Sequence, residues 1–163
     1  MISRSLLLLA LLAPSLAAWS SPLAAVLASD LIMARSHEKF PEAMLTLQTS
    51  IKEHGYTVAR VQRIDIGLTG MGYKTDKYRV VFVGKKDEIQ YLTKKYPRLT
   101  PYMPPKVSIF AEKGDTVLVT VNPVIYKEMV GDDEDKLIFD RWANDIYSVF
   151  NDFSMAAEEV YRD

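Results

Sequence analysis

Cysteine is absent from this chain of 163 residues, and histidine occurs only twice. The absence of cysteine excludes disulfide bonds, thiolate nucleophiles and cysteine-ligated zinc. The sequence also lacks any Asn-x-Ser/Thr site for N-glycosylation. A fold without these covalent features depends on its hydrophobic core, for which a chain of this length is sufficient.

Charged residues are scarce at the N-terminus, where residues 1–28 hold a single one, Arg4. An apolar run, Leu6–Ala13, follows that charge. A basic start before a short apolar run is typical of an export signal, which is removed after a small-x-small site. Such sites end at Ala17 and at Ala28. We favour the second, because it leaves Ser29 at the start of the first patterned segment.

An uncleaved membrane anchor is the alternative interpretation of this N-terminal segment. A membrane span requires about 20 continuous apolar residues, and Pro14 and the run Trp19–Pro22 interrupt this one. We therefore predict an export signal over residues 1–28 and one domain over residues 29–163. The predicted location is periplasmic or secreted, with membrane contact only through an uncleaved N-terminal segment.

Net charge offers little attraction for a polyanion, because 20 basic and 21 acidic residues give a formal net charge of −1. This balance argues against nucleic acid as a general partner. The charge is unevenly distributed, since residues 131–163 hold ten acidic but only three basic residues. Two interpretations stay open. The acidic segment packs on a basic body, or each charged face recruits a charged partner.

Apolar spacing predicts two amphipathic helices. In the first, Phe40, Met44, Leu47 and Ile51 recur at intervals of three and four residues, which places them on one helix face. Gly55 is expected to end this helix. The second helix follows the acidic residues 132–135 and carries a longer stripe with the same spacing. Its members are Phe139, Trp142, Ile146, Val149, Phe153, Ala156 and Val160.

Segments rich in β-branched residues predict five strands, over residues 30–36, 56–66, 78–83, 106–111 and 116–121. The glycines of residues 67–72 predict a loop. A weaker helical pattern covers residues 86–96. Residues 97–105 contain four prolines and are expected to be irregular.

The order of these elements predicts an α+β domain with a five-stranded antiparallel sheet and helices gathered on one face. The apolar stripe of the last helix needs a large surface to cover, and the sheet provides one. Coiled-coil dimerisation through the same stripe is the alternative.

Packing and turn motifs recur between Leu31 and Pro123. They lie in Phe40–Met44, Gly55–Tyr56, Tyr78–Val80, Tyr102–Pro104, Val107–Glu112 and Thr116–Pro123. In these motifs the chain resembles the bacterial and archaeal domain-of-unknown-function family 302 (DUF302). The resemblance implies a curved antiparallel sheet that grips a long C-terminal helix in the order β-α-β-β-β-β-α, and it suggests a homodimer. It implies no activity and no catalytic residues.

Basic and aromatic residues gather around the predicted short helix of residues 86–96. The adjacent proline-rich segment has the irregular character of loops that shape pockets. We therefore predict a site for a small anionic ligand here, with a solvated helix face as the alternative. The residues of this predicted basic patch are Lys85, Lys86, Tyr91, Lys94, Lys95, Arg98 and Tyr102.

Our leading functional hypothesis is an exported, non-catalytic binding or accessory module that forms a dimer and needs no cofactor. Its ligand would occupy a crevice between the last helix and the sheet. The first alternative is a small hydrolase or isomerase that uses His54, Asp65 and Asp76 for acid–base catalysis. The two aspartates flank the glycine-rich segment, so the chain can bring them together.

Metal or haem binding is the second alternative. His37 and His54 would be joined by methionines, for example Met33, Met44 or Met71. Neither a His-x-x-x-His nor a Glu-x-x-His spacing supports such a site. Methionines at helical spacing are also ordinary core residues.

Overall fold

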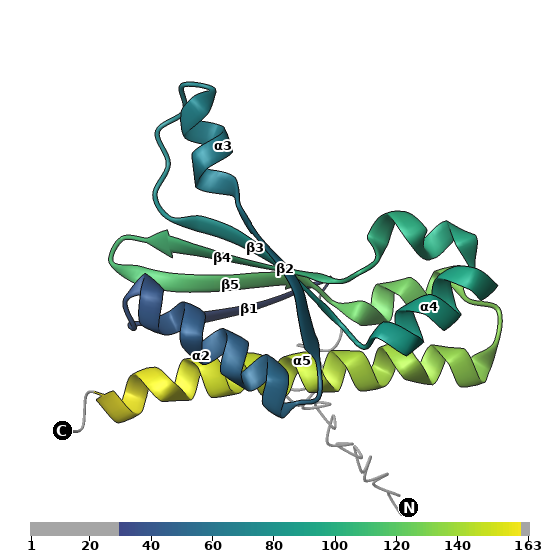
Figure 1. The fold of residues 1–163 in the computed structure, drawn as a ribbon. Coiled ribbons are helices and arrows are strands. Elements are labelled where there is room, and N and C mark those ends of the chain that lie inside the picture. Colours follow the sequence, from purple (N-terminus) through teal and green to yellow (C-terminus); the bar gives the residue numbers. More distant parts are fainter. Residues whose placement is uncertain (1–29, 161–163) are drawn as a thin grey trace, which may run out of the picture.

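The computed structural model describes residues 30–160, so the predicted export signal lies outside the described residues. The described chain has the predicted α+β architecture, with one five-stranded antiparallel sheet and a long C-terminal helix packed on one face (Figure 1). No helix in this part of the chain is both long enough and apolar enough to span a bilayer.

Strands, helices and short 3-10 helices (η) follow the predicted order. In sequence they are β1 (Leu31–Ser36), α2 (Phe40–Glu53), β2 (Thr57–Arg63), α3 (Ile64–Gly70), β3 (Tyr78–Gly84), α4 (Lys86–Lys95), η1 (Pro97–Tyr102), β4 (Lys106–Glu112), β5 (Asp115–Val121), η2 (Pro123–Met129) and α5 (Asp133–Val160).

The sheet has the strand order β1-β5-β4-β3-β2, and all its neighbouring strands are antiparallel. β2 to β5 pair successively along the chain, whereas β1 pairs with the distant β5, with Ile32 opposite Thr120. In the edge strand β2 the register shifts between Val58 and Arg60. Such a bulge bends an edge strand and hinders pairing with a foreign strand.

The first long helix, α2, forms where the sequence predicts it. Pro41 lies in its first turn, where a missing N–H costs nothing. Glu42 and Lys52 stand at the helix ends that favour their charges. Gly55 follows the helix with φ of +76°, a left-handed conformation that glycine adopts without strain. Phe40, Leu47 and Ile51 of the apolar face are buried, and Met44 is partly buried against them.

The C-terminal helix α5 buries the predicted apolar stripe from Phe139 to Phe153 in its own subunit, whereas Ala156 is half-buried and the Val160 side chain lies outside the described residues. Phe139, Trp142 and Phe153 are at most 1% exposed, and Ile146 and Val149 at most 6%. They join the core formed with α2 and the sheet. Burying each of these side chains contributes about 1.5–3 kcal/mol. Because the stripe covers the sheet, the coiled-coil alternative is wrong.

Residues 64–70 correct the expectation of a strand that runs to Ile66 and a glycine loop that follows it. Pairing between β2 and β3 ends where Arg63 lies opposite Arg79. Beyond this point the chain has no partner strand, and it forms helix α3, which satisfies backbone groups internally. Asp65 supports the first turn by accepting a hydrogen bond from the Ile66 N–H at 2.9 Å.

Two 3-10 helices were not predicted. Residues 97–102 form η1 in place of an irregular segment, and a 3-10 turn tolerates Pro97 at its start. η2 follows β5, and the Asn122 side chain caps it by accepting a hydrogen bond from the Val124 N–H at 3.2 Å. The predicted hairpin between β4 and β5 is confirmed, with Lys113 and Gly114 at positive φ in its turn.

Candidate functional site

The predicted basic patch lies beside the acidic first turns of α5. Lys95 Nζ is 2.6 Å from a carboxylate oxygen of Asp135 and 3.3 Å from one of Asp132. The hydroxyls of Tyr91 and Tyr96 also donate hydrogen bonds to Asp135, at 3.1 and 2.8 Å. Lys95 and Tyr91 therefore belong to a network that joins α4 to α5.

Asp135 is the buried centre of this network, with 6% of its surface exposed. Burial on its own would raise the pKa of Asp135, but hydrogen bonds from Lys95, Tyr96 and Tyr91 outweigh burial and hold that pKa below its usual value. The same contact raises the pKa of Lys95. Because each group keeps the other charged, the pair is a structural tie and is not poised to exchange a proton near neutral pH.

Two further basic residues of the patch are also engaged within the chain. Lys85 Nζ lies 3.6 Å from Asp145 and 4.6 Å from the centre of the Tyr56 ring, a distance suited to a cation–π contact. Arg98 Nε donates a hydrogen bond to the main-chain oxygen of Met129 at 2.7 Å. The acidic α5 thus packs on a basic body, as the first interpretation of the uneven charge predicts.

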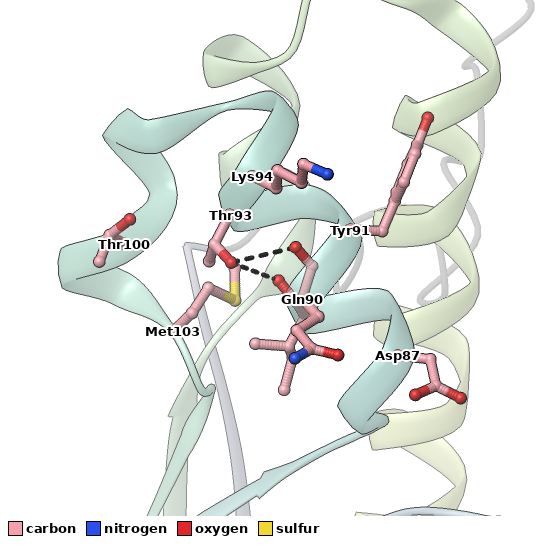
Figure 2. A pocket seen from close by; sticks show the side chains of 8 residues that line it. Asp87, Gln90, Tyr91, Thr93, Lys94, Thr100 and Met103 are labelled. Atoms are coloured by element: carbon pink, nitrogen blue, oxygen red, sulfur yellow. Dashed lines mark hydrogen bonds between the residues drawn. The ribbon is translucent and has the colours of Figure 1, made fainter.

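Lys86 and Lys94 form none of the ion pairs found between residues 30 and 160. Lys94 lines an open groove of about 720 Å³ beside α4 and η1 (Figure 2). Asp87 lines the same groove, so these two charges cancel. Tyr102 instead packs against Tyr126, with ring centres 5.8 Å apart. The patch is therefore split between this groove and the contacts with α5 and Tyr126, and the small anionic ligand stays a prediction.

The predicted acid–base residue His54 lies at the end of α2. Its Nε2 atom is 3.0 Å from Oδ2 of Asp152, which also accepts a hydrogen bond from Ser50 Oγ at 2.6 Å. These contacts tie α2 to α5. All of β2 separates His54 from Asp65, and seven extended residues span roughly 20 Å. That separation is far beyond hydrogen-bond reach.

The two predicted aspartates do lie together, around an open hollow of about 360 Å³ at the base of α3. Asp65 Oδ1 is 2.5 Å from Arg79 Nη1, and both side chains are at most 16% exposed. The hydrogen bond from Arg79 lowers the pKa of Asp65. A general acid needs a raised pKa, so Asp65 is tuned in the opposite direction. The structure brings Asp65 and Asp76 together but leaves His54 apart.

The two histidines have separate partners. His37 Nδ1 is 2.8 Å from Asp115 Oδ1 at the start of β5, whereas His54 contacts Asp152. Across residues 30–160, no three histidine, aspartate or glutamate side chains gather as metal ligands. Met44 packs against the hydrophobic core.

The crevice expected between α5 and the sheet is filled by side chains. The space bounded by Tyr56, Val83, Val149 and their neighbours measures about 10 Å³. That volume is at the lower limit for one water molecule. The expectation of a ligand beneath α5 is therefore corrected, because bulky residues such as Trp142 and Phe153 occupy the interior.

The open face of the sheet is the side turned away from α2 and α5 (Figure 1). Side chains alternate along each strand, so the residues between the core positions lie on this face. The register sets Met33 opposite Val119 and Phe110 opposite Val117. The apolar residues of the open face are Leu31, Met33, Tyr78, Val80, Phe82, Phe110, Val117, Val119 and Val121.

Several of these side chains are strongly exposed to solvent. Leu31 is 48%, Met33 62% and Val121 37% exposed. Tyr78 and Phe110 pack edge to face on the same side, with ring centres 6.0 Å apart. The helix–sheet contacts of α2 and α5 belong to the opposite, buried face. Within the described chain the open face is thus largely apolar and neither long helix covers it, although Ser108 lies between Val80 and Val119 and Val117 is only 2% exposed.

Sequence reasoning missed this surface, although a signal was present. An antiparallel strand with one buried and one solvated face alternates apolar and polar residues. In β3, residues 80–83 are all apolar, and in β5 residues 117–119 are all apolar. Apolar residues at both alternating positions indicate that both faces of the sheet are apolar. Because helices were expected on only one face, the other face needs a partner.

The two ends of the open face carry different charges. At one end Arg35 bridges Glu112 and Asp115, with 3.0 Å between Arg35 Nη1 and Asp115 Oδ2. Hydrogen bonds from Arg35 and, for Asp115, chiefly from His37 lower the pKa values of both carboxyl groups. At the other end lie Arg60 and Lys106, next to Phe82 in the register.

Comparison with known proteins agrees with this fold. A crystal structure of an uncharacterized conserved DUF302 protein from Bacillus stearothermophilus is similar, with a TM-score of 0.68 and 17% sequence identity. The match covers 77% of this chain and 98% of that chain. A comparison with curated proteins found no match. Residues 32–153 match the family described as domain of unknown function DUF302, and the chain therefore belongs to the DUF302 family, as its packing and turn motifs predict.

Proposed function

We propose that this protein is an exported, non-catalytic accessory module that acts as a homodimer, with the open face of the sheet as its interface. The apolar character of that face carries the proposal. Nine apolar side chains from four strands lie on this side of the sheet; Val117 among them is buried, whereas Met33 is 62% exposed. Large exposed apolar patches on folded proteins mark interaction sites.

Partial charge complementarity favours a second copy as the occupant, because Arg35 and Lys113 balance the carboxylates at one end whereas the other end is basic. One end of the open face holds two carboxylates that share Arg35, and the other end holds Arg60 and Lys106. A two-fold axis across the strands brings Arg60 and Lys106 of each copy over the Glu112 and Asp115 carboxylates of the other. The apolar residues of one copy then contact those of the other, and the charged residues pair across the interface. An isologous interface requires this self-complementarity.

The open face is smaller than the contact area that a stable dimer needs. Five strands of six or seven residues give a face of roughly 20 Å by 20 Å, or roughly 400 Å² in projection. A stable interface buries about 800 Å² on each partner. The ruffled side chains add area, but a stable dimer also needs contacts beyond the sheet.

Replacement of Met33 tests the interface. We expect the protein to sediment as a dimer at micromolar concentration and the Met33→Glu variant to sediment as a monomer. The substitution buries an unpaired charge in each half of the interface. Leu137→Glu is the matched control, because Leu137 is 63% exposed on α5, on the other side of the sheet. A monomeric parent protein, or equal effects of the two variants, contradicts the proposal.

The export part of the proposal depends on the apolar run that precedes β1. Sequencing of the N-terminus of secreted or periplasmic material tests it. We expect the mature chain to begin at Ser29. Material that begins at Met1 excludes cleavage.

A further inference from the structure

We propose that the α3 arm, residues 64–77, packs against the second subunit and so completes the dimer interface. This inference rests on the homodimer proposed above. The arm projects from the ends of β2 and β3 and points away from α2 and α5 (Figure 1). The arm thus extends beyond the end of the sheet, while its base is tied through Asp65 to Arg79, which lies over the Phe40 ring of α2.

Helix α3 lacks the support that a short helix needs. It has seven residues, contains Gly67 and Gly70, and buries none of its side chains. Helices of this length do not persist in water through intrinsic propensity, and glycine weakens them further. The ion pair between Asp65 and Arg79 holds the first turn, and backbone hydrogen bonds from Met71, Gly72 and Tyr73 close the last one. The apolar side chains of the arm contribute little to its support because they stay exposed.

Exposed apolar side chains on the arm identify the surface that would be covered. Ile66 is 53%, Met71 68% and Tyr73 63% exposed. Large apolar groups on a protruding element mark a docking surface when they cluster in this way. Their burial by a second copy supplies the contact area that the open face lacks.

The charges of the arm favour a protein partner over a membrane. The arm holds two acidic residues, Asp65 and Asp76, and two basic residues, Lys74 and Lys77. A segment that binds acidic lipid carries an excess of basic residues. The balanced charge of the arm offers no such attraction, whereas its apolar side chains match the apolar open face of another copy.

The arm is tested by the double variant Met71→Ser/Tyr73→Ser, with Met155→Ser as a matched control. Met155 is 55% exposed on α5. Sedimentation should show a dimer dissociation constant that rises about tenfold or more in the double variant, while the control matches the parent protein. Hydrogen exchange of the α3 amides should slow as protein concentration rises through that constant, because dimerisation buries the helix.

The outcomes separate this inference from the dimer itself. If the parent protein is monomeric, both proposals fail. If Met33→Glu dissociates the dimer but the arm variant does not, and α3 exchange is independent of concentration, the arm inference fails alone. Loss of binding to vesicles of acidic phospholipid in the arm variant, with an unchanged dimer, also overturns it and assigns the arm to a membrane.

Discussion

At the scale of single residues, Glu88 connects the short helix α4 to the core. One carboxylate oxygen accepts a hydrogen bond from the Trp142 indole N–H at 2.6 Å, and the other contacts Arg141 Nη2 at 2.5 Å. Trp142 is 1% exposed, so its N–H has no access to bulk water. Glu88 is therefore the acceptor on which the largest core side chain depends.

Glu88→Ala should lower the free energy of unfolding by about 1–3 kcal/mol, because it leaves a buried N–H without an acceptor. Glu88→Gln keeps an acceptor oxygen and should recover most of this loss. Urea unfolding followed by tryptophan fluorescence measures both variants. Equal stability of the alanine and glutamine variants would show that the hydrogen bond contributes nothing.

The carboxyl groups of Asp135 and Asp152 predict a pH dependence of stability. Their pKa values are lower in the folded chain than the ordinary aspartate value of 3.8. Between the folded-state pKa and the unfolded-state pKa of each aspartate, the unfolded chain binds more protons than the folded chain. The free energy of unfolding therefore rises with pH over this interval. The contribution is complete above the unfolded pKa and is lost as pH falls through the folded pKa.

We therefore expect the free energy of unfolding to decline from about pH 5 downwards. Asp152→Asn should show a shallower decline than the parent protein, because one of the responsible groups is removed. Chemical unfolding at a series of pH values measures the slope. An unchanged slope in this variant would assign the pH dependence to other carboxyl groups.

At the scale of elements, regular periodicity made much of the fold predictable. The spacing from Phe40 to Ile51 and from Phe139 to Phe153 fixed both long helices, because local sequence decides which face is apolar. α3 was missed, because Gly67 and Gly70 resemble a loop and its formation depends on where pairing in the sheet ends. Tertiary context overrode local propensity there.

The hairpin turn between β4 and β5 gives a test at this scale. Gly114 has φ of +97° and open space where a Cβ would lie, so Gly114→Ala costs backbone strain alone, about 1–2 kcal/mol. Gly67 also has open space but no positive φ. Gly67→Ala should therefore leave stability unchanged or raise it. Thermal unfolding should show a lower midpoint for Gly114→Ala and an unchanged or higher midpoint for Gly67→Ala.

At the scale of the whole molecule, the candidate site was the least predictable part. The predicted basic patch consists of side chains that are close in sequence, but Lys95 and Lys85 are engaged by Asp135 and Asp145, which are distant in sequence. Ion pairs of this kind depend on how α5 lies across the sheet. The number of charged residues in each segment does not predict which of them pair. The open face was detectable in principle, because β3 and β5 are apolar at both alternating positions.

The direction of the proposed two-fold axis is testable by exchange of charges. Lys106→Glu and Glu112→Lys should each weaken self-association, because like charges then meet across the interface. An equimolar mixture of the two variants should recover association as a heterodimer. Native mass spectrometry distinguishes the species once the two chains differ in isotope label. Failure of the mixture to associate, when each variant alone is folded, rules out this axis.

The pairing of β1 with β5 also has a consequence for folding. Ser36 pairs with Thr116 across 79 intervening residues, whereas each strand from β2 to β4 pairs with the next strand along the chain. Long-range pairing slows folding because a large loop must close first. In a chain that emerges with its N-terminus first, β1 therefore waits as an unpaired strand until Val121 has followed. The strand that is made first therefore depends for its pairing on the strand that is made last.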